Sequence, residues 1–201
     1  MKSIKIRLKK GDLETAEQFA LDRINLSYGH YEKRGQANYD KIVYDIKIGA
    51  LGEIAIYRLL KKLGIKTNEP DFTVYEKKKK SFNADFSDDN GFHYHCKSQS
   101  EESAEKYGLS HILQYGGDGY GHEDKLFKSR TNRDFLIPCL VSLSTEEVEI
   151  FGCYKVETLF KKDLIKMPKI KWLERTKRAI YLDDLLQLTH LQRWGKILSG
   201  K

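Results

Sequence analysis

The sequence predicts an α/β fold in which a mixed central β-sheet is flanked by helices, with extra helices at both ends of the chain. Three observations predict it: apolar residues recur at helical spacing up to residue 63, then at a period of two up to residue 97, and dense strand-length runs follow at 135–154. With 201 residues, 40% of them hydrophobic, the chain is long enough for one domain with a real core. We therefore expect a single domain over 1–201.

Two helices are predicted in the first third of the chain. The first begins at Asp12, the expected N-cap, and its apolar residues recur every three or four positions as far as Ile24. The second runs from about Asp40 to Leu63. Gly64 is expected to end it, because glycine readily adopts the left-handed conformation that closes a helix.

The rest of the chain alternates between strands and helices. A strand is predicted at 72–75 and a short helix at 101–113. The apolar run 135–141 predicts a strand in which Pro138 indicates an edge or a bulge, and 148–154 predicts a second strand that pairs back on it. A final helix is expected at 182–198.

The most informative segment is a predicted β-hairpin at 83–97. If residues 89–91 form a three-residue loop with the glycine in the left-handed region, Asp85 lies opposite His95. Lys97, two residues further on, then shares the same face of the sheet.

The other register depends on a two-residue loop. With 90–91 as the loop, Asp85 would lie opposite Cys96, and His95 and Lys97 would point to the far face. Only the three-residue loop brings a carboxylate and an ammonium to one place. Together with a divalent metal, that pair is the minimum needed to hydrolyse a phosphodiester.

The order of these motifs resembles the PD-(D/E)XK, or restriction-endonuclease-like, nuclease superfamily. Residues 49–60 resemble its opening helix, with Glu53 in the place of an acid near the metal. Asp85 resembles the catalytic aspartate, and His95-Cys96-Lys97 takes the place of the (D/E)-x-K motif. The resemblance spans about 34–160, through the paired strands that follow, and it leaves 161–201 as a basic, helical C-terminal extension.

The resemblance implies a restriction-endonuclease-like core and a metal-dependent DNA endonuclease of restriction or phage type. Its catalytic residues would be Asp85, His95 and Lys97. Mg²⁺, with Mn²⁺ as the alternative, would be held by Asp85, Glu53 and the backbone carbonyl of Cys96. Lys97 would stabilise the charge that develops on the phosphate or position the attacking water.

The chain departs from the family pattern at one position. His95 stands where a carboxylate is expected, and a neutral imidazole brings no negative charge and is a poorer partner for Mg²⁺. A protein of the same fold that binds nucleic acid with weakened or lost cleavage is therefore the alternative. In addition, Pro70-Asp71 spells the first letters of the family motif, so Asp71 competes with Asp85 as the key aspartate.

The charge of the chain favours a polyanionic partner. Its formal net charge is +7 and its pI about 9.1. DNA contacts are expected from a basic turn and from two arginines: Lys77, Lys78, Lys79, Lys80, Arg130 and Arg133. A homodimer is compatible with this activity, because cutting both strands usually requires two active sites.

The cysteines and the N-terminal residues indicate the cellular compartment of the protein. The three cysteines have no CxxC spacing and lie in apolar contexts, which favours buried thiols in a reducing environment. Residues 1–10 alternate basic and apolar types without an uncharged apolar run, so we expect a soluble cytoplasmic protein without a signal peptide or a membrane partner.

Overall fold

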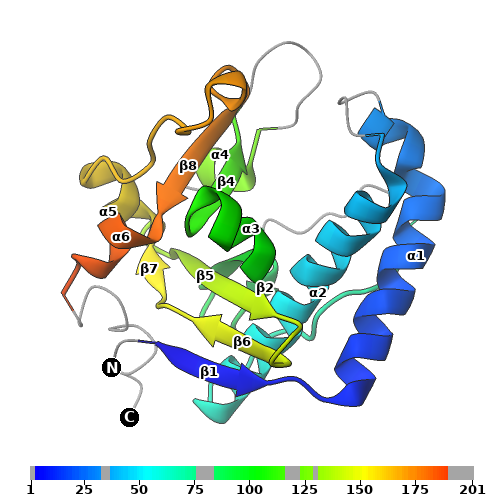
Figure 1. The fold of residues 1–201 in the computed structure, drawn as a ribbon. Coiled ribbons are helices and arrows are strands. Elements are labelled where there is room, and N and C mark those ends of the chain that lie inside the picture. The colour runs from blue at the N-terminus through cyan, green and yellow to red at the C-terminus, as the bar shows by residue number, and fades with distance from the viewer. Residues whose placement is uncertain (1–2, 33–36, 76–83, 116–122, 129–130, 190–201) are drawn as a thin grey trace.

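The protein is described here by a computed structural model, which covers residues 3–32, 37–75, 84–115, 123–128 and 131–189 (Figure 1). A mixed sheet has the strand order β1-β6-β5-β3-β2, with β7 paired to β5, and a separate two-stranded ribbon joins β4 to β8. The expected α/β class with a mixed sheet flanked by helices is confirmed. The strands are β1 (Ile4–Arg7), β2 (Phe86–Ser87), β3 (His93–Ser100), β4 (Ser110–Gln114), β5 (Asp134–Ser142), β6 (Glu147–Ile150), β7 (Tyr154–Lys155) and β8 (Lys177–Tyr181).

Two long helices, α1 (Lys10–Glu32) and α2 (Tyr39–Lys62), lie side by side on one face of the main sheet (Figure 1). The prediction for α2 is confirmed: the Asn38 side chain accepts from the Lys41 N–H (3.0 Å), and Gly64 follows the helix with φ +76°. The expectation that Asp12 is an N-cap is wrong. Asp12 lies in the first turn of α1, where its carboxylate forms an ion pair with Arg58 of α2.

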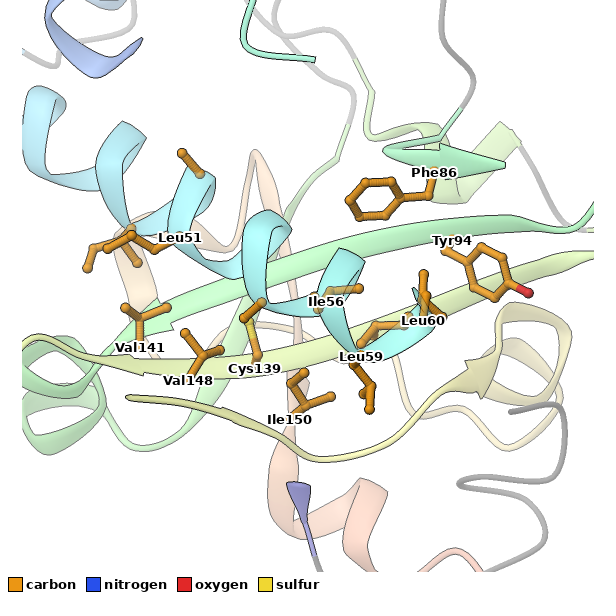
Figure 2. Close-up of a cluster of buried hydrophobic side chains, with 14 of the residues drawn as sticks. Leu51, Ile56, Leu59, Leu60, Phe86, Tyr94, Cys139, Val141, Val148 and Ile150 are labelled. Atoms are coloured by element: carbon orange, nitrogen blue, oxygen red, sulfur yellow. The ribbon is translucent and has the colours of Figure 1, made fainter. Parts of the chain in front are cut away.

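Helix α2 packs its apolar face on β3, β5 and β6. Figure 2 shows Leu51, Ile56, Leu59 and Leu60 lying between the helix and the strands, facing side chains that include Val141. All five side chains are almost fully buried, and each contributes about 1.5–3 kcal/mol through removal of apolar surface from water. This contact fixes the position of α2 over the centre of the sheet.

The opposite face of the sheet is covered by the β4–β8 ribbon and by short helices. A second apolar cluster fills this layer, with Leu113 of β4, Leu136 of β5 and Ile180 of β8 at its centre. The short helices are α3 (Glu101–Tyr107), α4 (Lys125–Lys128), α5 (Val156–Lys161), the 3₁₀ turn η1 (Lys171–Leu173) and α6 (Leu182–Leu186). None of the described helices is both long and apolar enough to span a bilayer.

Several predicted elements differ from the structure. Residues 72–75 form no strand, and the helix predicted at 101–113 ends at Tyr107 because the chain continues into β4. The C-terminal segment is not a helical extension over its described part: 177–181 form β8, and the helix predicted at 182–198 ends at Leu186, with 190–201 outside the described residues. Pairing with β8 overrides the local helical spacing at 110–113.

Pro138 lies in a central strand and not at a sheet edge. It pairs with Lys97 in the parallel ladder between β5 and β3. On its other side β5 meets two separate strands, β7 at 135–136 and β6 at 139–142. The Pro138 carbonyl accepts from Phe151 N–H (3.1 Å) in the gap between those strands, so the missing proline N–H falls where no ladder bond is required.

The contact between α2 and β3 predicts opposite effects for two glycines of the same helix. A Cβ atom at Gly52 would lie 1.9 Å from Ser98 Oγ and 3.0 Å from Cys139 Sγ, whereas one at Gly49 would meet nothing within 4 Å. We expect Gly52→Ala to lower the free energy of unfolding by about 1–3 kcal/mol. Gly49→Ala, the matched control, should raise it by about 0.5–1 kcal/mol. Urea unfolding measures both, and an equal effect of the two changes would contradict the packing described.

Candidate active site

The hairpin adopts the three-residue loop. Asp88 N–H donates to the Phe92 carbonyl (2.9 Å), Gly91 has φ +72°, and Phe86 pairs with Tyr94. The short loop that would have placed Asp85 opposite Cys96 is thereby excluded. His95 and Lys97 consequently lie on the face of β3 that turns toward the β4–β8 ribbon.

Asp85 is held at the edge of β3 by two hydrogen bonds. Its N–H donates to the Tyr94 carbonyl (3.1 Å), and its Oδ2 accepts from the N–H of Cys96 (2.7 Å). Because β2 begins only at Phe86, the Asp85 carboxylate occupies the place on β3 that the next ladder bond would take. A carboxylate fixed by backbone atoms in this way keeps its position without support from mobile side chains.

Lys97 lies between two carboxylates. Its Nζ is 2.6 Å from Asp124 Oδ2. Burial on its own lowers the pKa of the ammonium, but the negative charges of Asp124 and Asp85 outweigh burial, and the pKa is raised above its ordinary value. Lys97 therefore remains charged at neutral pH although it is largely shielded from water.

Asp124 is positioned by its own backbone. Its N–H donates to the Gln114 carbonyl of β4 (2.8 Å), and its Oδ1 accepts from Leu126 N–H (3.1 Å) at the start of α4. This second bond is of the kind made by helix N-caps. The other carboxylate oxygen, Oδ2, accepts from the Lys97 ammonium.

His95 is buried, with 4% of its surface exposed, and its Nε2 lies 3.3 Å from Asp134 Oδ1. Burial lowers its pKa, although Asp134 and Asp85 oppose the shift, so the ring is neutral at neutral pH. A neutral ring that donates from Nε2 to Asp134 keeps a lone pair on Nδ1. Asp134 is held in turn by Thr131, whose N–H donates to Oδ2 (3.2 Å).

Glu53 approaches from the other layer. The pKa of the Cys96 thiol is raised well above its ordinary value, chiefly by burial and then by the charges of Asp85 and Glu53. Both predicted carboxylate ligands are therefore within electrostatic reach of Cys96. The structure places Asp85, His95, Cys96 and Lys97 close together on and beside β3. Glu53 lies on α2, on the opposite face of the sheet from His95 and Lys97, within electrostatic reach of Cys96.

A second imidazole, His111, belongs to the same region. It is 2% exposed and shares the inner face of β4 with Leu113, and neither ring nitrogen has a hydrogen-bond partner among the described residues. Burial, and then the charge of Lys97, lowers its pKa to about 3. Its neighbour Ser110 is attached to β3, because Ser110 N–H donates to Gln99 Oε1 (2.8 Å).

The sequence did not indicate Asp124, Asp134 or His111 as site residues. Each reaches the site through a contact between residues far apart in the chain: Asp124 lies 27 positions from Lys97 and Asp134 lies 39 from His95. The one available signal was the position of Asp134 at the start of a predicted strand.

The remaining candidates lie elsewhere. Lys77, Lys78, Lys79, Lys80 and Arg130 fall outside the described residues. Arg133 is exposed, and its Nη1 lies 3.5 Å from the Asn90 carbonyl at the hairpin tip, while its neighbour Asp134 bonds His95. The rival aspartate, Asp71, accepts from Thr73 N–H (3.0 Å) and Tyr75 O–H (3.0 Å) within its own loop.

Comparison with known proteins assigns neither a family nor a function to the chain. No protein-family model matches the chain, and no curated protein matches it. Among the described residues, no three His, Cys, Asp or Glu side chains are grouped so that they could hold a metal ion unaided.

The buried state of His111 predicts a pH dependence of stability. Its pKa falls from 6.5 in the unfolded chain to about 3 in the fold, so stability that is complete above about pH 6.5 is lost as the pH falls toward 3. At pH 5 the loss due to His111 is about 2 kcal/mol. Between pH 7.5 and pH 5, His111→Leu should therefore lose about 2 kcal/mol less free energy of unfolding than the wild type in urea titrations. An equal loss in both proteins would show that His111 is protonated within the fold.

Proposed function

We propose that the chain hydrolyses phosphodiester bonds of DNA, as a metal-dependent endonuclease of restriction or phage type. The observation that carries the proposal is that the Asp85 carboxylate lies within electrostatic reach of the Lys97 ammonium at the edge of β3. Asp85 is fixed by the N–H of Cys96, and Lys97 is kept charged by Asp85 and Asp124. A fixed carboxylate beside a shielded ammonium suits a phosphate that must be held and neutralised as it reacts.

The donor chemistry fits Mg²⁺, with Mn²⁺ as the alternative. Mg²⁺ is usually held by one or two carboxylates, substrate phosphates and several waters, and so needs no complete cage of side chains. Asp85 and Glu53 would provide the carboxylates and Cys96 its carbonyl. When bound, the metal would supply a nucleophilic hydroxide and polarise the phosphate.

The protein's own groups account for the remaining steps. Lys97 places its ammonium against the phosphate, and Asp124 keeps the lysine side chain in one orientation. Asp134 orients the neutral ring of His95, whose Nδ1 can accept a proton from water. The buried position of these groups strengthens each charge interaction relative to water.

A specific observation favours a second function, DNA binding without cleavage. Lys97 and His95 are each engaged by an aspartate, and position 95 supplies no carboxylate. In this alternative the two pairs stabilise the fold, and the positive charge of the chain binds DNA.

Cleavage of duplex DNA, assayed with Mg²⁺ and with Mn²⁺, distinguishes the nuclease from a protein that only binds DNA. We expect Lys97→Ala to reduce the cleavage rate about 100- to 1000-fold, and Asp85→Ala to reduce it comparably through loss of the fixed carboxylate. Lys106→Ala on the exposed surface of α3 and Asp71→Ala should cut at wild-type rates. Cleavage retained by Asp85→Ala would overturn the assignment of this aspartate. Salt-sensitive DNA binding without cleavage in either metal would establish the alternative.

Position 95 gives a separate test. A glutamate there would face Asp134, so His95→Glu is best combined with Asp134→Asn, which removes the repulsion between two carboxylates. We expect the double variant to cut at least about 10-fold faster with Mg²⁺, because even groups outside the metal shell change metal affinity 10- to 100-fold. Asp134→Asn alone is the matched control. No gain over that control would show that position 95 does not contribute to metal binding.

A further inference from the structure

Residues 166–179 form a strongly basic hairpin, called here the basic hairpin. It is closed by two backbone hydrogen bonds between Lys166 and Ala179, both of 2.8 Å. Between them the chain carries six basic residues and one acidic residue, a formal charge of +5 against +7 for the whole chain. The basic residues are Lys166, Lys169, Lys171, Arg175, Lys177 and Arg178. Most of the excess positive charge thus lies in fourteen residues.

Trp172, on η1 in the middle of this hairpin, is 80% exposed, more than any other large apolar side chain described. A tryptophan ring offers a broad face for stacking, and most tryptophans in folded proteins bury it. Its neighbours in the sequence are Lys171 and, three positions on, Arg175. An aromatic face among cations is the combination that binds nucleic-acid bases and backbone together.

Contacts with two tyrosines of the β4–β8 ribbon region hold the basic hairpin in place. Lys169 N–H donates to the Tyr181 hydroxyl (2.7 Å), and Lys169 Nζ lies 4.7 Å from the centre of that ring. At the other end, the Arg178 guanidinium lies 3.7 Å from the ring centre of Tyr115. The exposed Trp172 is therefore presented by a hairpin anchored on the β4–β8 ribbon.

The base of the hairpin adjoins the candidate active site. Tyr115 N–H donates to the Thr176 carbonyl (2.9 Å), and Lys177 binds the Gln114 side chain. Gln114 accepts from the N–H of Asp124, which pairs with Lys97. Figure 1 shows the chain that precedes β8 extending beyond the start of that strand, away from the main sheet.

We propose that the basic hairpin binds single-stranded nucleic acid and that Trp172 stacks on an unpaired base. The inference rests on the proposed function in taking nucleic acid as the polyanion. Bases in a duplex stack on each other and offer no free face, so a lone exposed ring favours unpaired bases. The preferred substrate would then contain a single-stranded segment next to the bond that is cut.

Fluorescence anisotropy in EDTA tests binding without any cleavage. A labelled oligonucleotide is compared as a single strand and as a duplex of the same sequence, in the Lys97→Ala background. We expect tighter binding of the single strand, and a loss of about 5- to 150-fold in Trp172→Ala, from the known contribution of one stacked base. Trp172→Phe should keep most of the affinity. Tyr107→Ala, which removes a 48% exposed ring on α3, is the matched control.

Salt titration tests the charge of the hairpin. Lys171→Ala should reduce the slope of log affinity against log salt by about 0.7 for single strands. Lys10→Ala on α1, whose side chain is 90% exposed, should leave the slope unchanged.

Several results would overturn the proposal. One is equal single-strand affinity of Trp172→Ala and Tyr107→Ala; another is preference for the duplex. Binding of anionic lipid vesicles that depends on Trp172 would assign the hairpin to a membrane surface, and Trp172-dependent dimerisation in sedimentation would assign it to a second copy. If the protein cuts duplex DNA but does not bind the single strand, this inference is wrong and the proposed nuclease function stands. If it binds the single strand but does not cut duplex DNA, the nuclease proposal is wrong and this inference stands. Trp172→Ala should show the wild-type circular dichroism, because the ring is exposed.

Discussion

The parallel pairing of β3 with β5 is the constraint on which the candidate site depends. Parallel neighbours cannot be joined by a tight turn, so the chain must leave the sheet and return through a long crossover. Residues 101–133 make that crossover, and they carry β4, with its unpartnered imidazole, and Asp124. The same pairing sets Asp134 at the start of β5 beside His95. The groups that surround Lys97 are therefore gathered by topology rather than by local sequence.

Because topology gathers the site residues, only the locally encoded parts of the structure could be predicted from the sequence. Helix α2 and the hairpin loop were predictable because their signals are local: an Asn cap, a closing glycine, and a glycine that permits a left-handed turn. The ribbon strands β4 and β8 are far apart in the chain: Ser110 pairs with Tyr181, 71 positions away. Their strand character follows from this long-range pairing, so the local pattern suggested a helix at β4 and gave no strand at β8. Pro138 indicated an edge for a similar reason, since the interruption that accommodates it belongs to other strands.

The site combines groups that are costly to bury. An ammonium shielded from water is tolerated because two carboxylates offset its desolvation, and a buried imidazole is tolerated because it stays neutral. The nitrogens of His111, which have no hydrogen-bond partner within the described part of the chain, are an exception to the rule that buried polar atoms are hydrogen-bonded. Such exceptions are more frequent at functional sites than in structural cores, because a ligand or reacting group can satisfy them. The layer between the sheet and the ribbon thus combines apolar packing with buried polar groups.

The ribbon also has a consequence for how the protein is made. Strand β4 emerges from the ribosome more than sixty residues before its partner β8, whereas the main sheet is complete once β7 has been synthesised. During that interval β4 has an open edge, and the groups it supports around Lys97 lack their final restraint. The main sheet can fold first, and the candidate site is completed only when the C-terminal strand arrives. A nascent chain of this protein would accordingly complete its main sheet before its candidate site.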